Sequence, residues 1–520
     1  MALSTSPFWE GNREDSEDVV VIELNQVGHG GSDLDILQAT QLHNKKGSFS
    51  AGMTTPVEPA TRKRVLKVIF ISLLLDLISF TFILPLFPKL LEFYRNVEAP
   101  LDPSAPPSKT LLSSVLGYLN AYKASFARPI DSRYDIVLLG GALGSLFSLL
   151  QAIASPIIGH FSDRYGRRTA LLLSMTGNIL SVLLWVMATD FRTFLASRIV
   201  GGLSEGNVQL ATAIATDISD PSKRGSTMAL IGACFSIAFT FGPALGAWLS
   251  SFSTVAANPF ATAAGVSLTL IVVETLYLYF CLPETLPALT QKTEPTGTQV
   301  SSTKSEEKKP ATTPTTTKST AVQRTNSHFL LNFTHFSFLL FFSGMEFSLP
   351  FMTYDLFAYD SAKNGRLLGF VGLIASLLQG GVTRRLPPLL SVRIGVIACL
   401  LAFIMLGRIT SVLGLYGAAA LLATTSATVV TGLNALSSFE SHEGERGGKL
   451  GMLRSWGQLG RGLGPVLFTS IYWWAGREVA YGIGALGMSW VALLVMYALK
   501  TPPGSERVRK ESHVAEKKEL

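Results

Sequence analysis

Long apolar segments alternate with short polar ones along most of the chain. Apolar runs of roughly 20 residues, the length that crosses about 30 Å of hydrocarbon, lie near 65–93, 135–158, 169–189, 193–216, 226–250, 260–282, 328–356, 366–382, 388–409, 411–436, 448–474 and 478–499. A polar stretch separates the sixth run from the seventh. The pattern predicts an all-α membrane protein with twelve transmembrane helices in two six-helix bundles.

Polar sequence lies before, between and after these two sets of runs. The middle stretch contains a threonine-rich segment at 312–317 and a charged cluster at 306–309. Such sequence cannot bury enough apolar area to fold alone. We therefore expect disordered cytoplasmic tails at 1–61 and 500–520, a disordered cytoplasmic linker at 284–327, and helix bundles at 62–283 and 328–499.

Composition supports a membrane protein, with 48% hydrophobic and 15% charged residues and a mean hydropathy of +0.36. The net charge of +7 would suggest nucleic acid as a partner of a soluble protein, but the basic residues lie in short segments beside apolar runs. We predict no nucleic-acid partner. Cys234, Cys281 and Cys399 fall inside apolar runs at unrelated spacings, which argues against disulfides, a metal site or a thiol nucleophile.

Basic residues concentrate before the first run and in every second loop. They are Arg62, Lys63, Arg64, Lys67, Arg164, Arg167, Arg168, Lys223, Arg224, Arg384, Arg385, Arg393, Arg446 and Lys449. The positive-inside rule then places both termini in the cytoplasm. The final Lys517-Lys518-Glu519-Leu520 looks like a dilysine retrieval signal for the endoplasmic reticulum, or a basic solubilising tail. The plasma membrane and the vacuole are the alternative locations.

An internal repeat indicates that the two halves are duplicates. The segment 224–243 aligns without gaps to 446–465, at an offset of 222 residues. The same offset carries Gly159 onto Gly381 but Asp163 onto Arg385. The bundles should be pseudo-symmetric, with the acidic residue retained in one turn only.

The turn between the second and third runs has the pattern GxxxDRxGRR. It is formed by Gly159, Asp163, Arg164, Gly166, Arg167 and Arg168. Gly159 permits close approach of two helices, and Asp163 can interact with a positive helix terminus. A solvated basic turn is the simpler alternative. The full spacing resembles a turn of the major facilitator superfamily of secondary transporters. This resemblance implies that Asp163 engages the cytoplasmic end of the eleventh helix and Arg198 when the gate shuts.

Other segments extend the resemblance over nearly all twelve runs. The stretch around Arg198 resembles the second signature of the superfamily. Gly232, Gly242, Pro243 and Gly246 resemble the motif of its antiporter branch, although close helix packing is the simpler alternative. The chain is also similar to the animal tetracycline transporter-like family, which implies a drug and organic-anion transporter of the proton antiporter type. A lysine of that family stands where this chain has Glu205, so substrate identity is not carried over.

Polar residues inside the fourth run recur at helical spacing. Arg198, Gly202, Glu205, Gln209 and Thr212 follow steps of four, three, four and three, which places them on one helix face. Lipid is a costly environment for such a face. It therefore lines a cavity, or an ion pair between Arg198 and Glu205 holds helices together.

Three acidic residues within apolar runs are candidates for proton coupling or substrate binding. Asp76 lies about midway along the first run, with Ser72 and Ser79 on its face, so a hydrogen-bonded packing role is the alternative. Glu346 in the seventh run is the counterpart candidate, with His335 eleven residues earlier, and Glu274 in the sixth run is the third.

The eleventh run carries a cationic face formed by Arg454, Gln458 and Arg461, at steps of four and three. Two arginines in one membrane helix need partners. An anionic substrate, Asp76 or Glu346 could supply them. The alternative is a pair of structural ion pairs between the halves.

No GxxxxGK[ST], HExxH or GxSxG motif is present in the sequence. We therefore predict neither an enzyme nor a metal or cofactor. The expected function is transport of a small amphipathic organic compound, a drug or organic anion, by proton-coupled antiport and alternating access. A uniporter, a symporter and a non-transporting receptor or scaffold remain alternatives. The expected partners are the substrate, protons and the lipid bilayer, and we expect a monomer.

Overall fold

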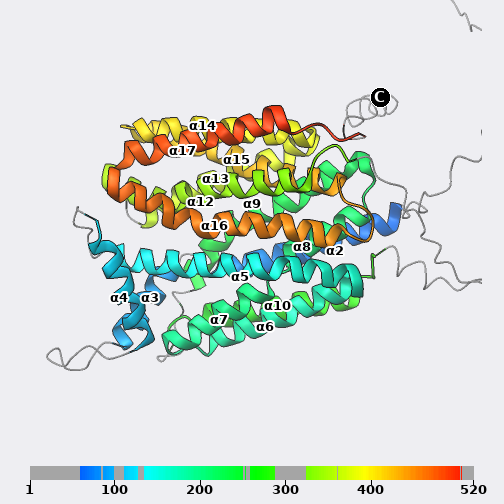
Figure 1. Cartoon of the computed structure of the whole chain (residues 1–520). Coiled ribbons are helices and arrows are strands. Elements are labelled where there is room, and N and C mark those ends of the chain that lie inside the picture. Colours follow the sequence, from blue (N-terminus) through cyan, green and yellow to red (C-terminus); the bar gives the residue numbers. More distant parts are fainter. Residues whose placement is uncertain are drawn as a thin grey trace, which may run out of the picture. The chain divides into compact units, whose positions relative to one another are not determined.

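The computed structural model describes residues 59–82, 86–98, 110–126, 134–249, 252, 258–286, 324–359, 361–503 and 505. Every regular element within these ranges is a helix, and the helices lie roughly alongside one another (Figure 1). The all-α prediction is confirmed. Most of the predicted tails and linker, together with the lysine-rich C-terminal end, lies outside the described residues, so those boundaries stay predictions.

Two sets of helices flank the linker. Before it come α2 (Pro59–Thr81), α3 (Phe87–Val97), α4 (Leu111–Ala124), α5 (Asp135–Tyr165), α6 (Arg167–Val186), α7 (Phe191–Ser204), α8 (Asn207–Asp217), η2 (Pro221–Lys223), α9 (Arg224–Leu249) and α10 (Ala261–Cys281). After it come α12 (His328–Phe357), α13 (Ser361–Gly381), η3 (Thr383–Arg385), α14 (Pro388–Arg408), α15 (Val412–Phe439), α16 (Arg446–Ala475), α17 (Arg477–Leu493) and η4 (Leu494–Ala498).

Within the described ranges, nine helices are long and apolar enough to cross a membrane by length and composition. They are α5, α6, α9, α10, α12, α13, α14, α15 and α17. The other three predicted runs form α2, the α7–α8 pair and α16. These three segments carry charged residues, or the helix within them breaks into pieces that are too short. The number of twelve transmembrane helices therefore stays a prediction.

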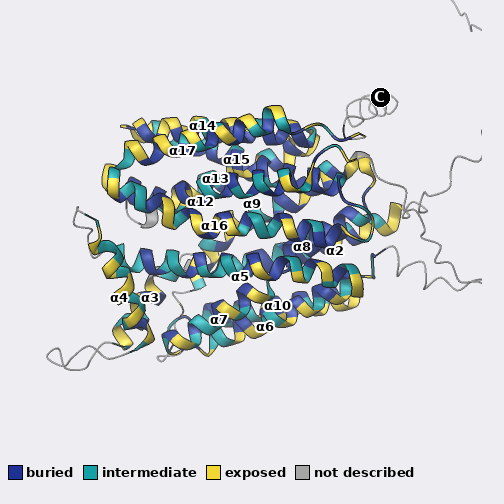
Figure 2. Ribbon diagram, viewed as in Figure 1, coloured by how far each residue is buried: buried dark blue, intermediate teal, exposed yellow. Residues whose placement is uncertain are grey.

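Apolar side chains form one large core in each half of the chain. The first extends from Val65 to Leu282 and also includes Ala435 of α15, and the second extends from Leu331 to Leu499. Helix α8 lies among its neighbours with all of residues 207–216 buried, whereas α6, α14 and α17 turn exposed residues outward (Figure 2). Helix α8 is therefore placed to present polar groups to the interior.

The first predicted run is not one helix. Helix α2 ends at Thr81 and α3 starts at Phe87, with Pro88 near its beginning. Proline fits the first turn of a helix, where its missing N–H group has no intrahelical partner. The sequence pattern hid this boundary because both segments are apolar.

The fourth predicted run is also interrupted, at Glu205 and Gly206. The backbone of Glu205 leaves helical geometry at φ −69° and ψ 83°. Ser174 of α6 supports the break, since its Oγ accepts a hydrogen bond from the Gly206 nitrogen at 2.9 Å and donates to the carbonyl of Ser204. Expecting one continuous helix was wrong, because a side chain of another helix satisfies the freed backbone groups.

Candidate substrate, proton and gate sites

Helix α5 ends and α16 begins at the same end of the bundle, which we call the basic end for its arginines Arg164, Arg167, Arg168, Arg224 and Arg446. Asp163 joins the two helices here. Its Oδ1 accepts a hydrogen bond from the Gly447 nitrogen at 2.9 Å, and its Oδ2 accepts one from the Gly448 nitrogen at 2.6 Å. No side chain of α16 caps that helix terminus. Asp163 therefore caps α16 from the other half of the chain, where the helix dipole favours a carboxylate.

Gly159 makes this contact possible by letting the backbones of α5 and α16 approach closely. A Cβ atom at Gly159 would overlap the carbonyl oxygen of Gly447. Small residues at a helix crossing are the usual means of bringing backbones together in membranes. The glycine and the aspartate thus act at one crossing, four residues apart on α5.

Arg167 extends the contact into a buried ionic network. It donates from Nη1 to Asp163 at 2.6 Å and from Nε to Asp217 at 2.8 Å. Asp217, at the end of α8, also accepts from Arg446 Nη1 at 3.0 Å. The network therefore spans α5, α6, α8 and α16 and links the two halves. Asp217 was absent from the sequence candidates.

The rest of the turn is held against the end of α10. Gly166 has φ 104°, a left-handed conformation that favours glycine. Glu284 accepts hydrogen bonds from the backbone nitrogens of Arg167 at 2.9 Å and Arg168 at 3.2 Å, so it caps α6. Arg168 also donates to the carbonyl of Tyr279 at 2.7 Å. Arg164 is exposed, and its guanidinium lies beside the ring of Tyr165.

Arg198 does not take part in this network, and its predicted contact with Asp163 is not formed. Its guanidinium lies 5.4 Å from the ring centroid of Phe194 and 5.9 Å from that of Phe147. Both rings provide a cation–π environment inside the bundle. The structure thus places Arg198 at an interior cavity. It does not lie at the contact between Asp163 and α16, which we call the latch.

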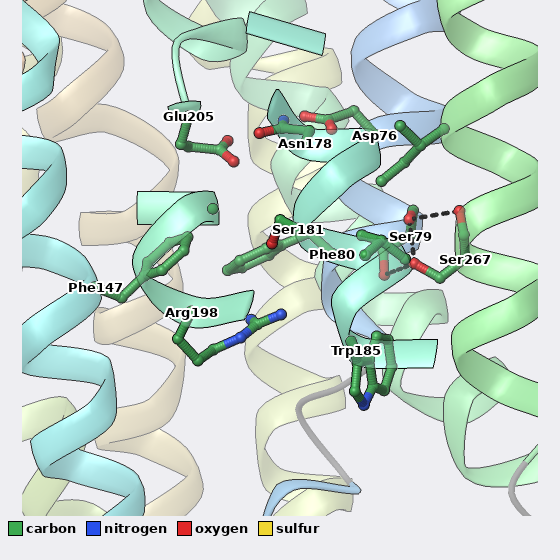
Figure 3. A pocket seen from close by; sticks show the side chains of 13 residues that line it. Asp76, Ser79, Phe80, Phe147, Asn178, Ser181, Trp185, Arg198, Glu205 and Ser267 are labelled. Atoms are coloured by element: carbon green, nitrogen blue, oxygen red, sulfur yellow. Dashed lines mark hydrogen bonds between the residues drawn. The ribbon is translucent and has the colours of Figure 1, made fainter. Parts of the chain in front are cut away.

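That cavity has a volume of about 40 Å³ and lies between α2, α5, α6, α7 and α10. Asp76, Glu205 and Arg198 line it together with the aromatic rings of Phe80 and Phe147 (Figure 3). Its volume suits a few water molecules and is far below that of a drug-sized site. An amphipathic substrate would require the helices around it to move.

Two carboxyl groups line the cavity, and a third lies within electrostatic range of them. Asp76, only 3% exposed, lies close enough to Glu205 and to Arg454 for their charges to interact, and Asn178 lies between the two acids (Figure 3). Glu274 is 1% exposed and lies within electrostatic range of Asp76. The structure therefore brings Asp76, Glu205 and Glu274 together but leaves Glu346 apart.

The serines near Asp76 bind other groups. Ser72 donates to Glu274 Oε1 at 2.7 Å, and the Ser79 and Ser267 hydroxyls lie 2.5 Å apart. The second oxygen of Glu274 has no hydrogen-bond partner within the described residues. Asp76 shares a side-chain hydrogen bond with Asn207 instead, so a hydrogen-bonded packing role remains the alternative to proton coupling.

The cationic face of α16 differs along its length. Arg454 is half-buried and donates to Gln151 Oε1 at 3.2 Å, Gln458 is half-buried, and Arg461 is exposed. No ion pair of Arg461 occurs among the residues that the structure describes. The charge of Arg461 is thus exposed, whereas Arg454 lies within electrostatic range of the carboxyl cluster.

The candidates on α12 lie apart from that cluster. His335 is buried, with Nδ1 2.9 Å from the carbonyl oxygen of Leu453, and its ring rests against Gly457 of α16. Glu346 is exposed and makes no ion pair in the described part of the chain. The structure pairs neither residue with Asp76.

The two polar residues after the break have different kinds of partner. Gln209 donates to the carbonyl of Ser155 in α5 at 2.9 Å, and Thr212 donates to its own helix at Val208 at 2.7 Å. The predicted single face is therefore divided. Arg198 and Glu205 line the cavity, while Gln209 fastens α8 to α5.

The glycines of α9 lie at helix crossings. A Cβ at Gly242 would overlap Thr81, one at Gly246 would overlap Phe82, and one at Gly232 would meet Gln379. Pro243 lies within the helix beside Gly242. Close packing against α2 and α13 explains these residues, and it gives no information about the direction of ion exchange.

Sequence reasoning missed Asn178, Ser174, Glu284 and Asp217. Ser174 and Asn178 are polar residues four positions apart in the third run, which is a signal of an interior-facing helix side. Glu284 and Asp217 follow apolar runs and look like ordinary loop acids. Only helix packing reveals their partners.

Comparison with known proteins agrees with this arrangement. The Major Facilitator Superfamily model matches residues 69–465. The chain is 36% identical over 454 residues to major facilitator superfamily domain-containing protein 10 of Mus musculus, covering 85% of this chain and 94% of that protein. It is 34% identical over 124 residues to the class C tetracycline resistance protein of Escherichia coli, covering 24% and 31%.

A solved structure gives the same result. The crystal structure of the human organic anion transporter MFSD10 (TETRAN) matches with a TM-score of 0.71 and 30% identity, covering 84% of this chain and all of that one. The predicted family and fold are thereby confirmed. This protein is a multi-pass membrane transporter rather than an enzyme, and it belongs to the major facilitator superfamily.

Proposed function

We propose that this protein carries a small amphipathic organic anion or drug across a membrane by proton-coupled antiport with alternating access, with both termini in the cytoplasm. The observation that carries this proposal is the cluster of Asp76, Glu205 and Glu274 beside Arg454. Carboxyl groups that share a buried site with an arginine can exchange protons when the neighbouring charges change. Ion coupling in transporters uses such groups.

Antiport follows if substrate and protons compete for the same groups. Asp76 and Glu205 both line the cavity, so a substrate group that contacts them displaces protons. Protons then leave these carboxyl groups when the substrate binds, and the substrate leaves when protons bind. Glu274 lies within electrostatic range of both carboxyl groups and supplies a third proton acceptor in the same half.

An anion requires a separate anchor, and the face of α16 supplies one. Arg461 is exposed, and Arg454 lies on the same face two turns earlier. Guanidinium groups recognise carboxylates in a bidentate manner. The solved relative described as an organic anion transporter supports this class of substrate, and the tetracycline resistance relatives support amphipathic drugs.

Symport is the second candidate, favoured by the position of Arg454. Its charge lies within range of Asp76 and Glu205. An anion that takes up this charge leaves the carboxyl groups to bind protons, so anion and protons would bind together. The sign of the coupling therefore depends on whether the substrate contacts the acids or the arginine first.

Alternating access fits the contact between Asp163 and α16 and the small interior cavity. Asp163 ties α5 to α16 in this conformation, and substrate entry from the basic end requires that contact to break. A receptor or scaffold would need neither a contact that breaks between the two halves nor a cluster of buried carboxyl groups.

Flux in proteoliposomes tests the proposal. Purified protein is reconstituted, a pH gradient of either sign is imposed, and uptake of a panel of organic anions and tetracyclines is followed together with internal pH. Opposite movement of substrate and protons supports antiport, and parallel movement supports symport. Flux that ignores the gradient indicates a uniporter, and binding without flux indicates a receptor.

A further inference from the structure

The contact between α9 and α13 corresponds, through the internal repeat, to the contact between α5 and α16. It contains a cavity of about 460 Å³ at the basic end. The lining residues are Arg62 and Leu66 of α2, Ser226, Thr227, Ala229, Leu230 and Ala233 of α9, and Gln379, Gly380, Arg384 and Arg385. The equivalent place beside α16 is filled by Asp163.

The offset of 222 residues makes the comparison specific. Gly159 packs against the backbone of Gly447, whereas nothing lies within 4 Å of a Cβ placed on Gly381. Asp163 corresponds to Arg385. The second crossing therefore has an open space and a guanidinium where the first has close packing and a carboxylate.

The cavity has more positive charge than its own side chains neutralise. Arg62 pairs with Asp220. Arg384 and Arg385 are exposed, and neither forms an ion pair with any residue that the structure describes. Unpaired arginines at the end of membrane helices form the chemistry that recognises phosphate headgroups.

A buried amide points into the same space. Gln379 is 3% exposed, and its Oε1 accepts a hydrogen bond from Ser236 Oγ at 2.5 Å. Its Nε2 donates no hydrogen bond to any described residue, although Gln379 lines the cavity. The Nε2 group therefore remains free to donate to an acceptor in the cavity.

We propose that this cavity binds the headgroup of an anionic phospholipid. The phosphate takes the place between the halves that the carboxylate of Asp163 has at the other crossing, held by Arg384 and Arg385 and contacted by Arg62. The wall formed by Leu66, Ala229, Leu230 and Ala233 is apolar and suits an acyl chain, which free phosphate lacks. The lipid thus completes the latch of the basic end.

Native mass spectrometry of the full chain in detergent tests this inference with phosphatidic acid, phosphatidylcholine and inorganic phosphate. Saturable binding of phosphatidic acid in preference to phosphatidylcholine is expected. Replacing both arginines, Arg384→Gln with Arg385→Gln, should weaken it about 30-fold, since each arginine near an anionic lipid contributes roughly fivefold. Arg366→Gln is the matched control, because this exposed arginine lies near the other end of α13.

A second variant separates the site from general charge attraction and from poor folding. Ala233→Phe fills the cavity without changing charge, and it should weaken phosphatidic acid binding while the protein stays monodisperse. Equal loss in Arg366→Gln, or full binding in Ala233→Phe, would overturn the proposal. Binding of inorganic phosphate that displaces the lipid without any contribution from an acyl chain would make free phosphate the occupant and overturn the lipid assignment.

Discussion

Asp163 on α5 accepts a hydrogen bond from the backbone nitrogen of Gly448 on α16 at 2.6 Å, across 285 positions of sequence. The contact joins the two halves at the basic end, and at its counterpart in the repeat Arg385 lines a cavity beside α9. In the cytoplasmic latch that we propose, side chains of the protein therefore close only one of the two repeat-related contacts.

Removing the charge of Asp163 should disturb gating strongly. We expect Asp163→Asn to lower the transport rate about tenfold, because a charge-assisted hydrogen bond contributes about 1.5–3 kcal/mol. Proteoliposome flux measures this, in vesicles of neutral lipid. Arg385→Gln is the control and should leave flux in those vesicles within about twofold. Equal losses would show that the asymmetry between the turns is misread.

Adding one methyl group should distinguish the two crossings. Gly159→Ala places a Cβ against the carbonyl of Gly447, so we expect a loss of roughly 1–3 kcal/mol in stability. Gly381→Ala meets open space and should change stability by less than about 0.5 kcal/mol. Thermal unfolding in detergent compares the two proteins. A neutral Gly159→Ala would contradict the close approach of the helices.

Asp76 should carry proton coupling. We expect Asp76→Asn to abolish the response of flux to a pH gradient while substrate exchange at equal pH persists, because an amide cannot take up a proton. Glu346→Gln is the matched control on an exposed acid of α12. Retained gradient dependence in Asp76→Asn, or its loss in Glu346→Gln, would move the proton site away from α2.

The two arginines of α16 should differ in effect. Arg461→Ala removes an exposed anion anchor, so we expect a raised KM for organic anions with little change in stability. Arg454→Ala also removes the arginine whose charge Asp76 and Glu205 share, and loss of roughly 3–5 kcal/mol is typical when one partner of a buried charge cluster is removed. Anion flux and thermal unfolding measured together separate these effects. Unchanged anion flux and pH dependence in both variants would exclude the anchor.

The break between α7 and α8 depends on Ser174. Ser174→Ala removes the acceptor for Gly206 and the donor to Ser204, and we expect a loss of about 1–3 kcal/mol. Thr176→Ala, two residues later on an exposed position with a hydrogen bond only to its own helix, should cost less than about 0.5 kcal/mol. Similar melting temperatures for the two variants would mean that Ser174 does not hold the break.

The sequence by itself determined the class of protein and the turn that contains Asp163. Hydropathy is local, so twenty-residue apolar runs indicated membrane helices wherever no charge or break intervened. The turn around Asp163 was recognisable because its spacing lies within ten residues. The correspondence between Asp163 and Arg385 in the internal repeat can also be read from the sequence alone.

Tertiary structure decided which polar groups meet. Glu274 receives its hydrogen bond from Ser72, 202 residues away, and helical spacing along one run carries no information about such a partner. Arg198 was expected at the latch and lies instead at the cavity, because the rings of Phe147 and Phe194 surround it. Glu205 faces Asp76 only because Ser174, from another helix, satisfies the backbone where α7 ends. These positions depend on packing between helices, which single-run periodicity does not encode.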